Sequence, residues 1–409
     1  MDDGKPAGPT YVGRVLRRAG MKRVGVLLTA GPGGGTYQYT QTILDAMLTL
    51  PRDRYSLVAA YIDPLWLDEL TADVERLALH DSRWNRALNK VWHTSHLPIS
   101  IWRNTAARLD SNIRALMSRH ADLWVCPNHD RYAFRAPVPT LGTVHDLMHR
   151  YERSFPEVSQ DGEYERREFH FSETCRWAKG VLVDSEVGKQ QLRESYDIAE
   201  SHVFVLPYVA PRYMRETPTS DSQFEARYKL PAKFFFYPAQ AYRHKNHRAL
   251  VEAIALMKHT HPDVQLVLVG AAERNGYKDL RALIEASGLS SYVQFLGYVP
   301  DADMPGFYKR ARALVMPTFF GPTNIPPLEA FVVGCPVATS RIYGVPQQLD
   351  DAALLFDPRS VEEIHDCLVR LWTDDSLCAD LAERGRDHAR KWGPEQFAAR
   401  FREIVGALT

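Results

Sequence analysis

The sequence predicts an α/β protein made of two doubly wound domains that face each other across a cleft. Its 409 residues are too many for one ordinary hydrophobic core. Short apolar runs alternate along the chain with longer amphipathic segments, which is the pattern of βαβ units in parallel sheets. A polar segment between Pro207 and Pro231, interrupted by further prolines, separates two such series and indicates an interdomain linker.

The apolar runs place the strands of each domain. In the first domain, residues 21–207, the candidate strands are 24–29, 57–62, 123–126, 140–144, 180–184 and 203–206. After a linker at 208–231, the second domain, residues 232–391, has candidate strands at 234–237, 264–269, 293–295, 313–316, 336–338 and 353–356. Helical patterns fall between the strands, for example at 247–258 and 280–286, and the last segment, 392–409, is expected to be an amphipathic helix. Ligands of such domains bind at the carboxyl ends of the strands.

The first residues differ in composition from the rest of the chain. Residues 1–20 are expected to form a mobile extension outside the first domain. A buried strand is predicted directly after Met21, so Met21 is a hypothesis for the true start of the protein.

Composition narrows the class of protein. Lys plus Arg and Asp plus Glu both total 50, so the net charge gives no sign of a nucleic-acid partner. The five cysteines are scattered singly without a C-x-x-C pair, which favours a reducing cytoplasm over a disulfide framework or a zinc site. No apolar run approaches the roughly 20 residues of a membrane-spanning helix, and no secretory signal precedes the first strand. These features predict a soluble, cytoplasmic protein.

The segment 318–340 predicts a phosphate site. It contains a strand end, a loop rich in Gly, Pro and Asn, a helix opened by Pro326 and Pro327, and Gly334 as the helix stop. A loop that leads into a helix N-terminus offers free backbone N–H groups and a partial positive charge. Glu329, in the first helical turn, is suited to accept hydrogen bonds from the hydroxyls of a ribose or a sugar; its alternative role is to complement the helix dipole.

Basic side chains follow the first strand of the second domain. Arg243, Lys245 and His247 crowd a predicted strand-to-helix loop, where Arg can bracket a diphosphate with its planar fork and Lys can act as a point charge. A solvated basic loop is the alternative interpretation.

Two motifs in the first domain also follow predicted strands. The glycine run at 31–35 lets the backbone approach a ligand closely or makes a tight turn, and it fits neither G-x-G-x-x-G nor a P-loop. His145 and Asp146 come directly after the strand at 140–144. A neutral imidazole there would hydrogen-bond a sugar hydroxyl or stabilise developing charge, and Asp146 would orient the loop or contact the acceptor. Asp184 is a weaker candidate of the same kind.

The segment Arg83 to Arg119 carries seven Arg or Lys residues and one acidic residue, Asp110, together with three tryptophans. Basic residues interleaved with tryptophan suit an anionic membrane surface or a lipid-diphosphate acceptor. The alternative is that the tryptophans belong to the core and the arginines are merely solvated. The first interpretation places the protein at the inner face of the membrane as a peripheral protein.

Taken together, the motifs resemble the retaining, nucleotide-sugar-dependent glycosyltransferases of family 4, which have the GT-B architecture of two Rossmann-like domains. The resemblance is dense over 234–405 and thinner over 21–206. It implies a hexosyltransferase, and it implies that the C-terminal helix crosses back to the first domain. Its implied site residues are Arg243, Lys245, Gly33, Gly34, Gly35, Asn324 and Ile325 for the donor diphosphate, Thr323 and Asn324 for the sugar, Glu329 for the ribose, Tyr298 and Val299 for the base, and His145 and Asp146 at the reacting centre.

The chain departs from the family pattern at two positions. The family signature E-x7-E has Glu329 as its second glutamate, but Gly321 occupies the place of the first. Thr323 and Asn324, in the same loop, are the polar residues that would replace the missing carboxylate. In the basic loop, Gln240 stands where the family usually has an arginine, and Arg243 is the expected substitute.

The Gly-Pro-Thr-Asn loop is similar to that of transferases of bacterial surface polysaccharides such as lipopolysaccharide, many of them mannosyltransferases. The resemblance therefore implies GDP-mannose as the first donor and a UDP-sugar as the second, with a glycan or a lipid-diphosphate-linked glycan as acceptor. No metal or other cofactor is expected, since no D-x-D string stands in a motif context. A nucleotide-sugar epimerase of the same architecture and a non-catalytic glycan-binding or scaffold protein are the alternatives.

Overall fold

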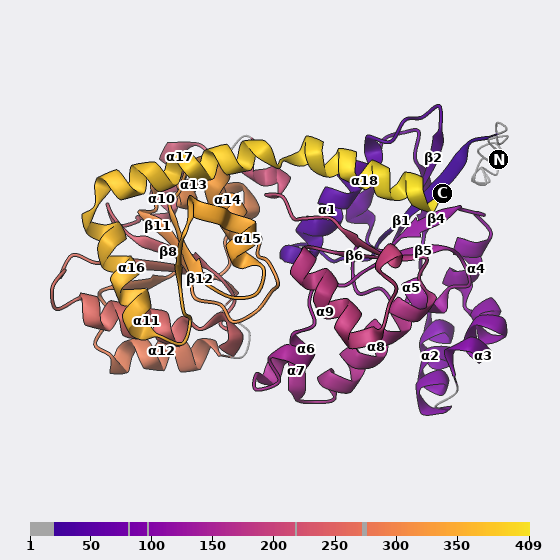
Figure 1. Cartoon of the computed structure of the whole chain (residues 1–409), viewed down its shortest axis with the longest axis horizontal. Helices are drawn as coiled ribbons and strands as arrows, with labels where there is room; N and C mark the ends of the chain where they lie inside the picture. The colour runs from indigo at the N-terminus through magenta and orange to yellow at the C-terminus, as the bar shows by residue number, and fades with distance from the viewer. Residues whose placement is uncertain (1–19, 81, 96–97, 217–218, 272–275) are drawn as a thin grey trace, which may run out of the picture.

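The computed structural model describes residues 20–80, 82–95, 98–216, 219–271 and 276–409. The expected N-terminal extension lies outside this part of the chain, apart from Gly20. The described residues form two parallel α/β domains that lie side by side (Figure 1). The predicted fold class is confirmed.

The first domain is built on a seven-stranded parallel sheet in the order β3-β2-β1-β4-β5-β6-β7. Its strands are β1 (Lys22–Leu28), β2 (Tyr55–Tyr61), β3 (Glu75–Ala78), β4 (Leu123–Val125), β5 (Thr140–Thr143), β6 (Gly180–Val183) and β7 (Val203–Val205). Its helices are α1 (Gly35–Leu48), α2 (Arg83–Ser95), α3 (Ile99–Asn104), α4 (Ser111–Met117), α5 (Tyr132–Arg135), α6 (Met148–Tyr151), α7 (Pro156–Ser159), α8 (Glu163–Trp177) and α9 (Glu186–Tyr196), with 3-10 turns η1 (Pro64–Glu69), η2 (Ala106–Leu109) and η3 (Glu200–His202). The sequence did not reveal β3, because only Leu77 is buried in this edge strand and no apolar run marks it.

The second domain is built on a six-stranded parallel sheet in the order β10-β9-β8-β11-β12-β13. Its strands are β8 (Phe235–Pro238), β9 (Leu266–Val269), β10 (Val293–Phe295), β11 (Ala313–Met316), β12 (Val337–Ser340) and β13 (Leu354–Phe356). The remaining elements are α10 (Asp221–Tyr228), α11 (His247–Met257), α12 (Tyr277–Ala286), α13 (Met304–Arg310), α14 (Pro326–Val333), α15 (Val345–Leu349), α16 (Val361–Thr373), α17 (Asp375–Lys391) and α18 (Pro394–Leu408), with 3-10 turns η4 (Arg212–Met214), η5 (Arg243–Lys245), η6 (Asp301–Asp303) and η7 (Asp350–Ala352).

Each sheet reverses its strand order once at its centre. The reversal falls between β1 and β4 in the first sheet and between β8 and β11 in the second. In doubly wound sheets, ligands bind in the crevice at the carboxyl ends of the strands on either side of such a switch point. The glycine run follows β1, the basic loop follows β8 and the loop at 317–325 follows β11, so three of the predicted motifs lie at the switch points.

Both faces of each sheet are covered, so neighbouring residues of a strand pack into different cores. On one face of the first sheet, Val26 of β1 packs in the same cluster as Ile43 of α1 and Phe401 of α18. On the other face, Leu27 packs in the same cluster as Trp102 of α3.

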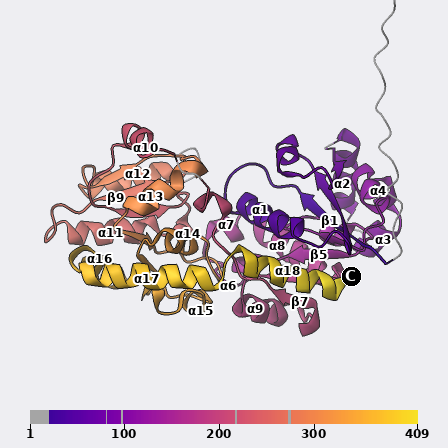
Figure 2. The same ribbon diagram turned by 90° about the horizontal axis from the view of Figure 1, so that it is seen from above.

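The C-terminal helices connect the domains. Helix α17 lies on the second domain, and α18 continues from it and packs against α1 of the first domain, as both views show (Figures 1 and 2). At the crossing, Trp392 donates its indole N–H to the carbonyl oxygen of Pro207, at the end of the first domain, at 3.2 Å. This hydrogen bond therefore joins the C-terminal crossing to the end of the first domain, directly before the interdomain linker.

Candidate active site

The first domain offers an open helix N-terminus at its switch point. Gly33 and Gly34 have φ values of 85° and 82°, in the left-handed region that favours glycine. No heavy atom lies within 4 Å of a Cβ built on Gly33, Gly34 or Gly35. Helix α1 begins at Gly35, so its first N–H groups face open space, as the phosphate hypothesis requires.

The loop after β11 explains why glycine stands at the first signature position. Gly321 has a φ of 99°, and a Cβ at this position would lie 2.7 Å from the carbonyl oxygen of Thr323 and 3.1 Å from Oδ1 of Asn324. The turn therefore excludes a glutamate at 321. The Asn324 amide lies where a side chain at 321 would begin.

Asn324 has an unused hydrogen-bond donor. Its backbone N–H donates to Oε1 of Gln348 at 2.9 Å, and Nε2 of Gln348 donates back to its carbonyl oxygen at 2.7 Å, which fixes the backbone. Its side chain is 9 % exposed, and Nδ2 is a buried donor with no partner among the described residues. An unpaired buried donor is costly, so this amide is well placed to bind a ligand oxygen.

Thr323 contacts the other domain. Its hydroxyl donates to Oδ2 of Asp184, which follows β6 in the first domain. Ser185 donates its hydroxyl to the other carboxylate oxygen of Asp184 at 3.1 Å. Burial raises the pKa of Asp184 to about 6, against the effect of these hydrogen bonds. In this arrangement Thr323 joins the domains, and its role as a sugar ligand stays a prediction.

Glu329 is held by two tyrosines. Its carboxylate is 5 % exposed. Tyr213, in the interdomain linker, donates its hydroxyl to Oε1 at 2.5 Å, and Tyr308 of α13 donates to Oε2. Burial raises the pKa of Glu329, while both tyrosine hydrogen bonds act to lower it. The carboxylate is thus already engaged with hydroxyl groups, which is the chemistry expected of it toward a ribose.

The basic loop brings one cation close to a carboxylate of the first domain. Burial lowers the pKa of Lys245, and the nearby Asp146 carboxylate acts to raise it by favouring the ammonium ion. The Arg243 side chain is exposed, and its backbone N–H donates to Oε1 of Glu157 on α7 at 2.6 Å. His247 packs in the core against Tyr237, so its ring is not part of an anion site.

His145 has both ring nitrogens engaged. Its Nε2 lies 3.1 Å from the carbonyl oxygen of Pro127, which can only accept, so the proton is on Nε2. Nδ1 then accepts from the hydroxyl of Tyr208 at 2.9 Å. Burial lowers the pKa of His145 to about 4, so the ring is neutral near pH 7. It is suited to a dipolar contact and not to transferring a proton at neutral pH.

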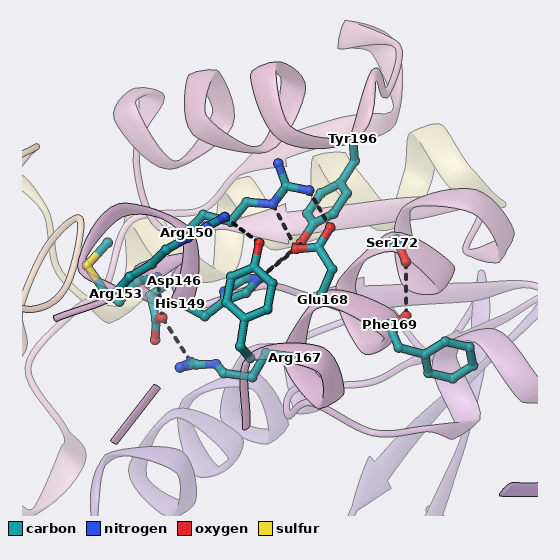
Figure 3. Close-up of polar contacts among 11 residues, drawn as sticks. Asp146, His149, Arg150, Arg153, Arg167, Glu168, Phe169, Ser172 and Tyr196 are labelled. Atoms are coloured by element: carbon teal, nitrogen blue, oxygen red, sulfur yellow. Dashed lines mark hydrogen bonds and ion pairs between the residues drawn. The ribbon is translucent and has the colours of Figure 1, made fainter. Parts of the chain in front are cut away.

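Asp146 is held in place by two hydrogen bonds within the first domain. Its Oδ1 accepts from Nη2 of Arg167 at 2.9 Å and from the backbone N–H of Met148 at 3.0 Å (Figure 3). Beside this pair, Glu168 accepts from Nε of Arg150 at 2.8 Å and lies 3.1 Å from Nε2 of His149. These contacts tie α6 to α8 and fix the strand end that carries Asp146.

The predicted base contacts lie beside the edge strand β10. Tyr298 is 68 % exposed, whereas Val299 is buried in a cluster with Met304 of α13. Ile325 is half-buried, and its carbonyl oxygen accepts from the N–H of Glu329. The ligand roles of these residues stay predictions.

Several residues at the site were missed by sequence reasoning. Tyr208 and Tyr213 come from the proline-spaced linker, and Glu157 comes from a four-residue helix. Asp130, after β4, accepts from the hydroxyl of Thr29, and burial raises its pKa to about 6. Asp130 could have been found, because it follows an apolar strand as His145 does; nothing in the sequence marks the others.

Comparisons with known proteins support the glycosyltransferase interpretation. Residues 220–388 match the family described as Glycosyl transferases group 1. The chain is 26 % identical over 296 residues to O-antigen chain mannosyltransferase B of Escherichia coli, an alignment that covers 68 % of this chain and 75 % of the relative. It is 28 % identical over 283 residues to D-inositol 3-phosphate glycosyltransferase of Corynebacterium jeikeium, covering 66 % of this chain and 67 % of the relative.

Solved structures share the fold. Anabaena HepE in complex with UDP and glucose superposes with a TM-score of 0.71 at 17 % identity, covering 94 % of this chain and 100 % of that one. Sucrose-phosphate synthase from Thermosynechococcus elongatus gives a TM-score of 0.72 at 19 % identity, covering 95 % of this chain and 99 % of that one. These comparisons confirm the GT-B fold and show that residues 220–388 resemble group 1 glycosyltransferases, with mannosyltransferases among the relatives. Assignment to family 4 stays a prediction.

Proposed function

We propose that the protein is a retaining hexosyltransferase that moves mannose from GDP-mannose to a glycan or a lipid-linked glycan. A UDP-sugar is the second choice of donor. The observation that carries the proposal is the position of the loop at 317–325, which lies at the switch point of the second domain and contacts the first domain through Thr323 and Asp184. A donor bound at this loop would present its sugar to both domains.

The departing diphosphate needs positive charge around it. Lys245 supplies a cation whose charged form Asp146 favours, and the N-terminus of α1 supplies oriented N–H groups. Helix α14 does not add to them, because it begins with Pro326 and Pro327, which have no N–H, and the N–H groups of Leu328 and Glu329 both donate to the carbonyl oxygen of Ile325. Groups that are already in place stabilise developing charge without having to reorganise. In the proposed site, Glu329 holds the ribose, Tyr298 stacks on the base and Asn324 binds the sugar through Nδ2 in place of the missing signature carboxylate.

The carboxylates that border the cleft support transfer without a covalent enzyme intermediate. Within the described part of the chain, Asp146 is held by Arg167, Asp184 by Thr323, and Glu329 by two tyrosines. Carboxylates that accept such hydrogen bonds suit electrostatic and orienting roles better than nucleophilic attack. We therefore propose retention by displacement on the same face of the sugar.

The relatives support the proposed pathway. One relative is named an O-antigen chain mannosyltransferase, and a second, 24 % identical over 259 residues, a serotype-specific mannosyltransferase. By analogy we propose a role in assembling a bacterial surface polysaccharide at the cytoplasmic face of the membrane. None of the described helices has the length and apolar character needed to cross a bilayer.

Donor binding tests the proposal directly. A thermal-shift screen with GDP-, UDP-, ADP- and dTDP-sugars is expected to show the largest rise with GDP-mannose, because a ligand at about 100 times its Kd stabilises the native state by about 2.7 kcal/mol. Lys245→Ala and Glu329→Ala should each weaken binding by about tenfold or more, through a lost charge or a lost pair of hydrogen bonds. Lys22→Ala is the matched control, because this exposed lysine begins β1 and so lies at the edge of the sheet opposite to the carboxyl ends of the strands.

The outcome separates three classes of protein. A transferase hydrolyses its donor slowly at most when no acceptor is present, and it makes a product with retained anomeric configuration, readable by NMR, when acceptor is added. Rapid conversion of the donor sugar without acceptor would identify an epimerase. If none of the nucleotide sugars shifts the melting temperature and both substitutions leave glycan binding unchanged, the protein is a glycan-binding module and the proposal is wrong.

A further inference from the structure

Helix α2 exposes an apolar stripe to solvent. Trp84 and Val91 are 59 % and 64 % exposed, and Ala87, also exposed, lies between them at helical spacing. The adjoining side of the helix packs inward: Trp92 is buried against Trp102 with their ring centroids 5.2 Å apart. Helix α2 therefore has one apolar face in the core and a second one that faces solvent.

Basic side chains run beside this stripe. Arg83, Arg86 and Lys90 are exposed and repeat with the same helical spacing as the apolar residues. The one acidic residue of the segment 83–119, Asp110, is buried and caps α4 by accepting from the N–H groups of Asn112 and Ile113. The side chains that this segment presents to solvent therefore add positive and not negative charge.

The same surface continues onto the neighbouring elements. Trp84 donates its indole N–H to the carbonyl oxygen of Leu109 at 3.1 Å, and Leu109 of η2 is itself 53 % exposed. A surface hollow of about 670 Å³ is lined by Arg108, the neighbour of Leu109 in the chain, by Arg114 and by other residues. Exposed apolar side chains are thus present on α2 and η2, and exposed basic side chains on α2, η2 and α4.

Two of the basic residues in this segment have a structural role instead. Arg103 donates to the carbonyl oxygens of Phe134 and Ala136 at 2.6 and 2.8 Å, and Arg119 pairs with Glu75 at 2.6 Å. The expected membrane contact of the segment Arg83 to Arg119 is therefore limited to those of its residues that face solvent. We call these the α2 surface: Arg83, Trp84, Arg86, Ala87, Lys90, Val91, Arg108, Leu109 and Arg114.

We propose that the α2 surface docks the protein on an anionic lipid bilayer. An interfacial helix is held by apolar side chains that enter the acyl boundary and by basic side chains that pair with lipid phosphates. Trp84 and Val91 are the apolar side chains that would enter the acyl boundary, and the flanking basic side chains would pair with the lipid phosphates. A large tryptophan left in water on a well-packed domain marks an interaction site, and the basic side chains beside it on α2 favour a negatively charged partner surface.

The position of the surface suits this role. Helices α2, α3 and α4 lie at the end of the first domain that is remote from the second domain, in both views (Figures 1 and 2). Docking through this end leaves the second domain free to move against the first. The inference does not depend on which sugar is transferred, so its failure would leave the proposed function standing.

Vesicle binding by the full-length protein tests the proposal. In co-sedimentation, the wild type is expected to bind vesicles with about one-third phosphatidylglycerol and to bind neutral phosphatidylcholine vesicles weakly. The variant Arg83→Gln/Arg86→Gln/Lys90→Gln should lower the partition coefficient on anionic vesicles by on the order of 100-fold, since each basic residue near such a surface contributes about fivefold. The variant Trp84→Ser/Val91→Ser should lower it by about tenfold or more through lost apolar burial.

Matched controls keep the test specific. Arg248→Gln/Arg281→Gln/Arg390→Gln removes three exposed charges from the second domain, and Leu256→Ser removes an exposed apolar side chain from α11. Both should bind as the wild type does, and all variants should keep their melting temperature and their donor binding. Equal loss of binding in the charge control would show that net charge alone drives adsorption, which overturns the assignment to α2. Wild-type binding that the α2 substitutions leave intact also overturns it, as does a dimer in solution that the Trp84→Ser/Val91→Ser variant dissociates.

Discussion

The contact between Tyr213 and Glu329 makes the interdomain linker a competitor of the donor. The Tyr213 hydroxyl donates to Oε1 of Glu329 at 2.5 Å, at the carboxylate that we propose for the ribose. A ribose hydroxyl would donate to the same carboxylate oxygen, so it must compete with the tyrosine hydroxyl that is already bound there. We therefore predict that Tyr213→Phe, which keeps the ring and removes the hydroxyl, strengthens the binding of nucleoside diphosphates.

The magnitude follows from the kind of hydrogen bond. A hydrogen bond to a charged group contributes about 1.5–3 kcal/mol net, and one as short as this belongs to the strong end of such bonds. Removing the competitor should tighten donor binding by about tenfold, which corresponds to 1.4 kcal/mol, and should lower the free energy of unfolding of the unliganded protein by a similar amount. Since the tyrosine hydrogen bond also lowers the pKa of Glu329, the substitution should raise that pKa further.

Tyr308→Phe is the matched control. Its hydroxyl donates to Oε2 of the same carboxylate, but the ring is fully buried in the core of the second domain and belongs to α13, not to the linker. This substitution should lower stability without tightening donor binding. Isothermal titration with GDP and UDP, combined with urea unfolding, measures both quantities. If Tyr213→Phe weakens nucleotide binding as Tyr308→Phe does, Tyr213 orients Glu329 for the donor and the competition is refuted.

Three further predictions concern the same cleft. Gly321→Glu, which restores the signature residue, should lower the unfolding free energy by about 1–3 kcal/mol and reduce turnover, because a non-glycine residue at positive φ is strained. Gly31→Ala is the control: a Cβ at this position meets no atom within 4 Å, so the melting temperature should stay unchanged. Thr323→Val should raise the pKa of Asp184 above its value of about 6. Because the folded-state pKa of Asp184 is raised from 3.8, the stability that its protonation contributes is fully present below pH 3.8 and is lost as the pH rises through 6. In urea unfolding at several pH values, the free energy of unfolding of Thr323→Val should therefore fall further over this range than that of the wild type. An equal dependence on pH in both proteins would contradict the interdomain contact. NMR titration of His145 should give a midpoint near pH 4, whereas a midpoint near 6.5 would mean that its ring is solvated.

The sequence predicted the parts of the site that belong to local motifs. The basic loop after β8, the glycine run after β1 and the loop after β11 each follow a strand, and a parallel sheet brings strand ends to one edge. Contacts between distant segments carried no such signal. Asp184 and Thr323 are 139 residues apart, and Tyr213 and Glu329 are 116 apart. Such pairs depend on how the two domains meet, which no periodicity in the chain records.

The sequence also did not determine which side chains of a helix face the core and which face solvent. Trp84 and Trp92 lie on the same helix, yet one is exposed and the other is in the core. Eight residues correspond to about 80° around a helix, so spacing places them on neighbouring parts of α2, and only packing against α3 decides which part is covered. The prediction of a basic, tryptophan-rich surface was therefore too broad, and the buried Trp92 and Trp102 had to be removed from it.

The contacts across the cleft imply that donor exchange and domain movement are linked. Thr323 belongs to the proposed sugar loop, and its hydroxyl is committed to Asp184 of the other domain. In the same interface, Phe155 of the first domain packs on Phe319 and Phe320, with ring centroids 5.1 and 5.2 Å apart. A sugar oxygen that accepts the Thr323 proton must break the contact with Asp184, whereas one that accepts from the Asn324 amide need not. Asn324 can therefore donate a hydrogen bond to the sugar while the domains stay together, whereas Thr323 can donate one only in an opened form.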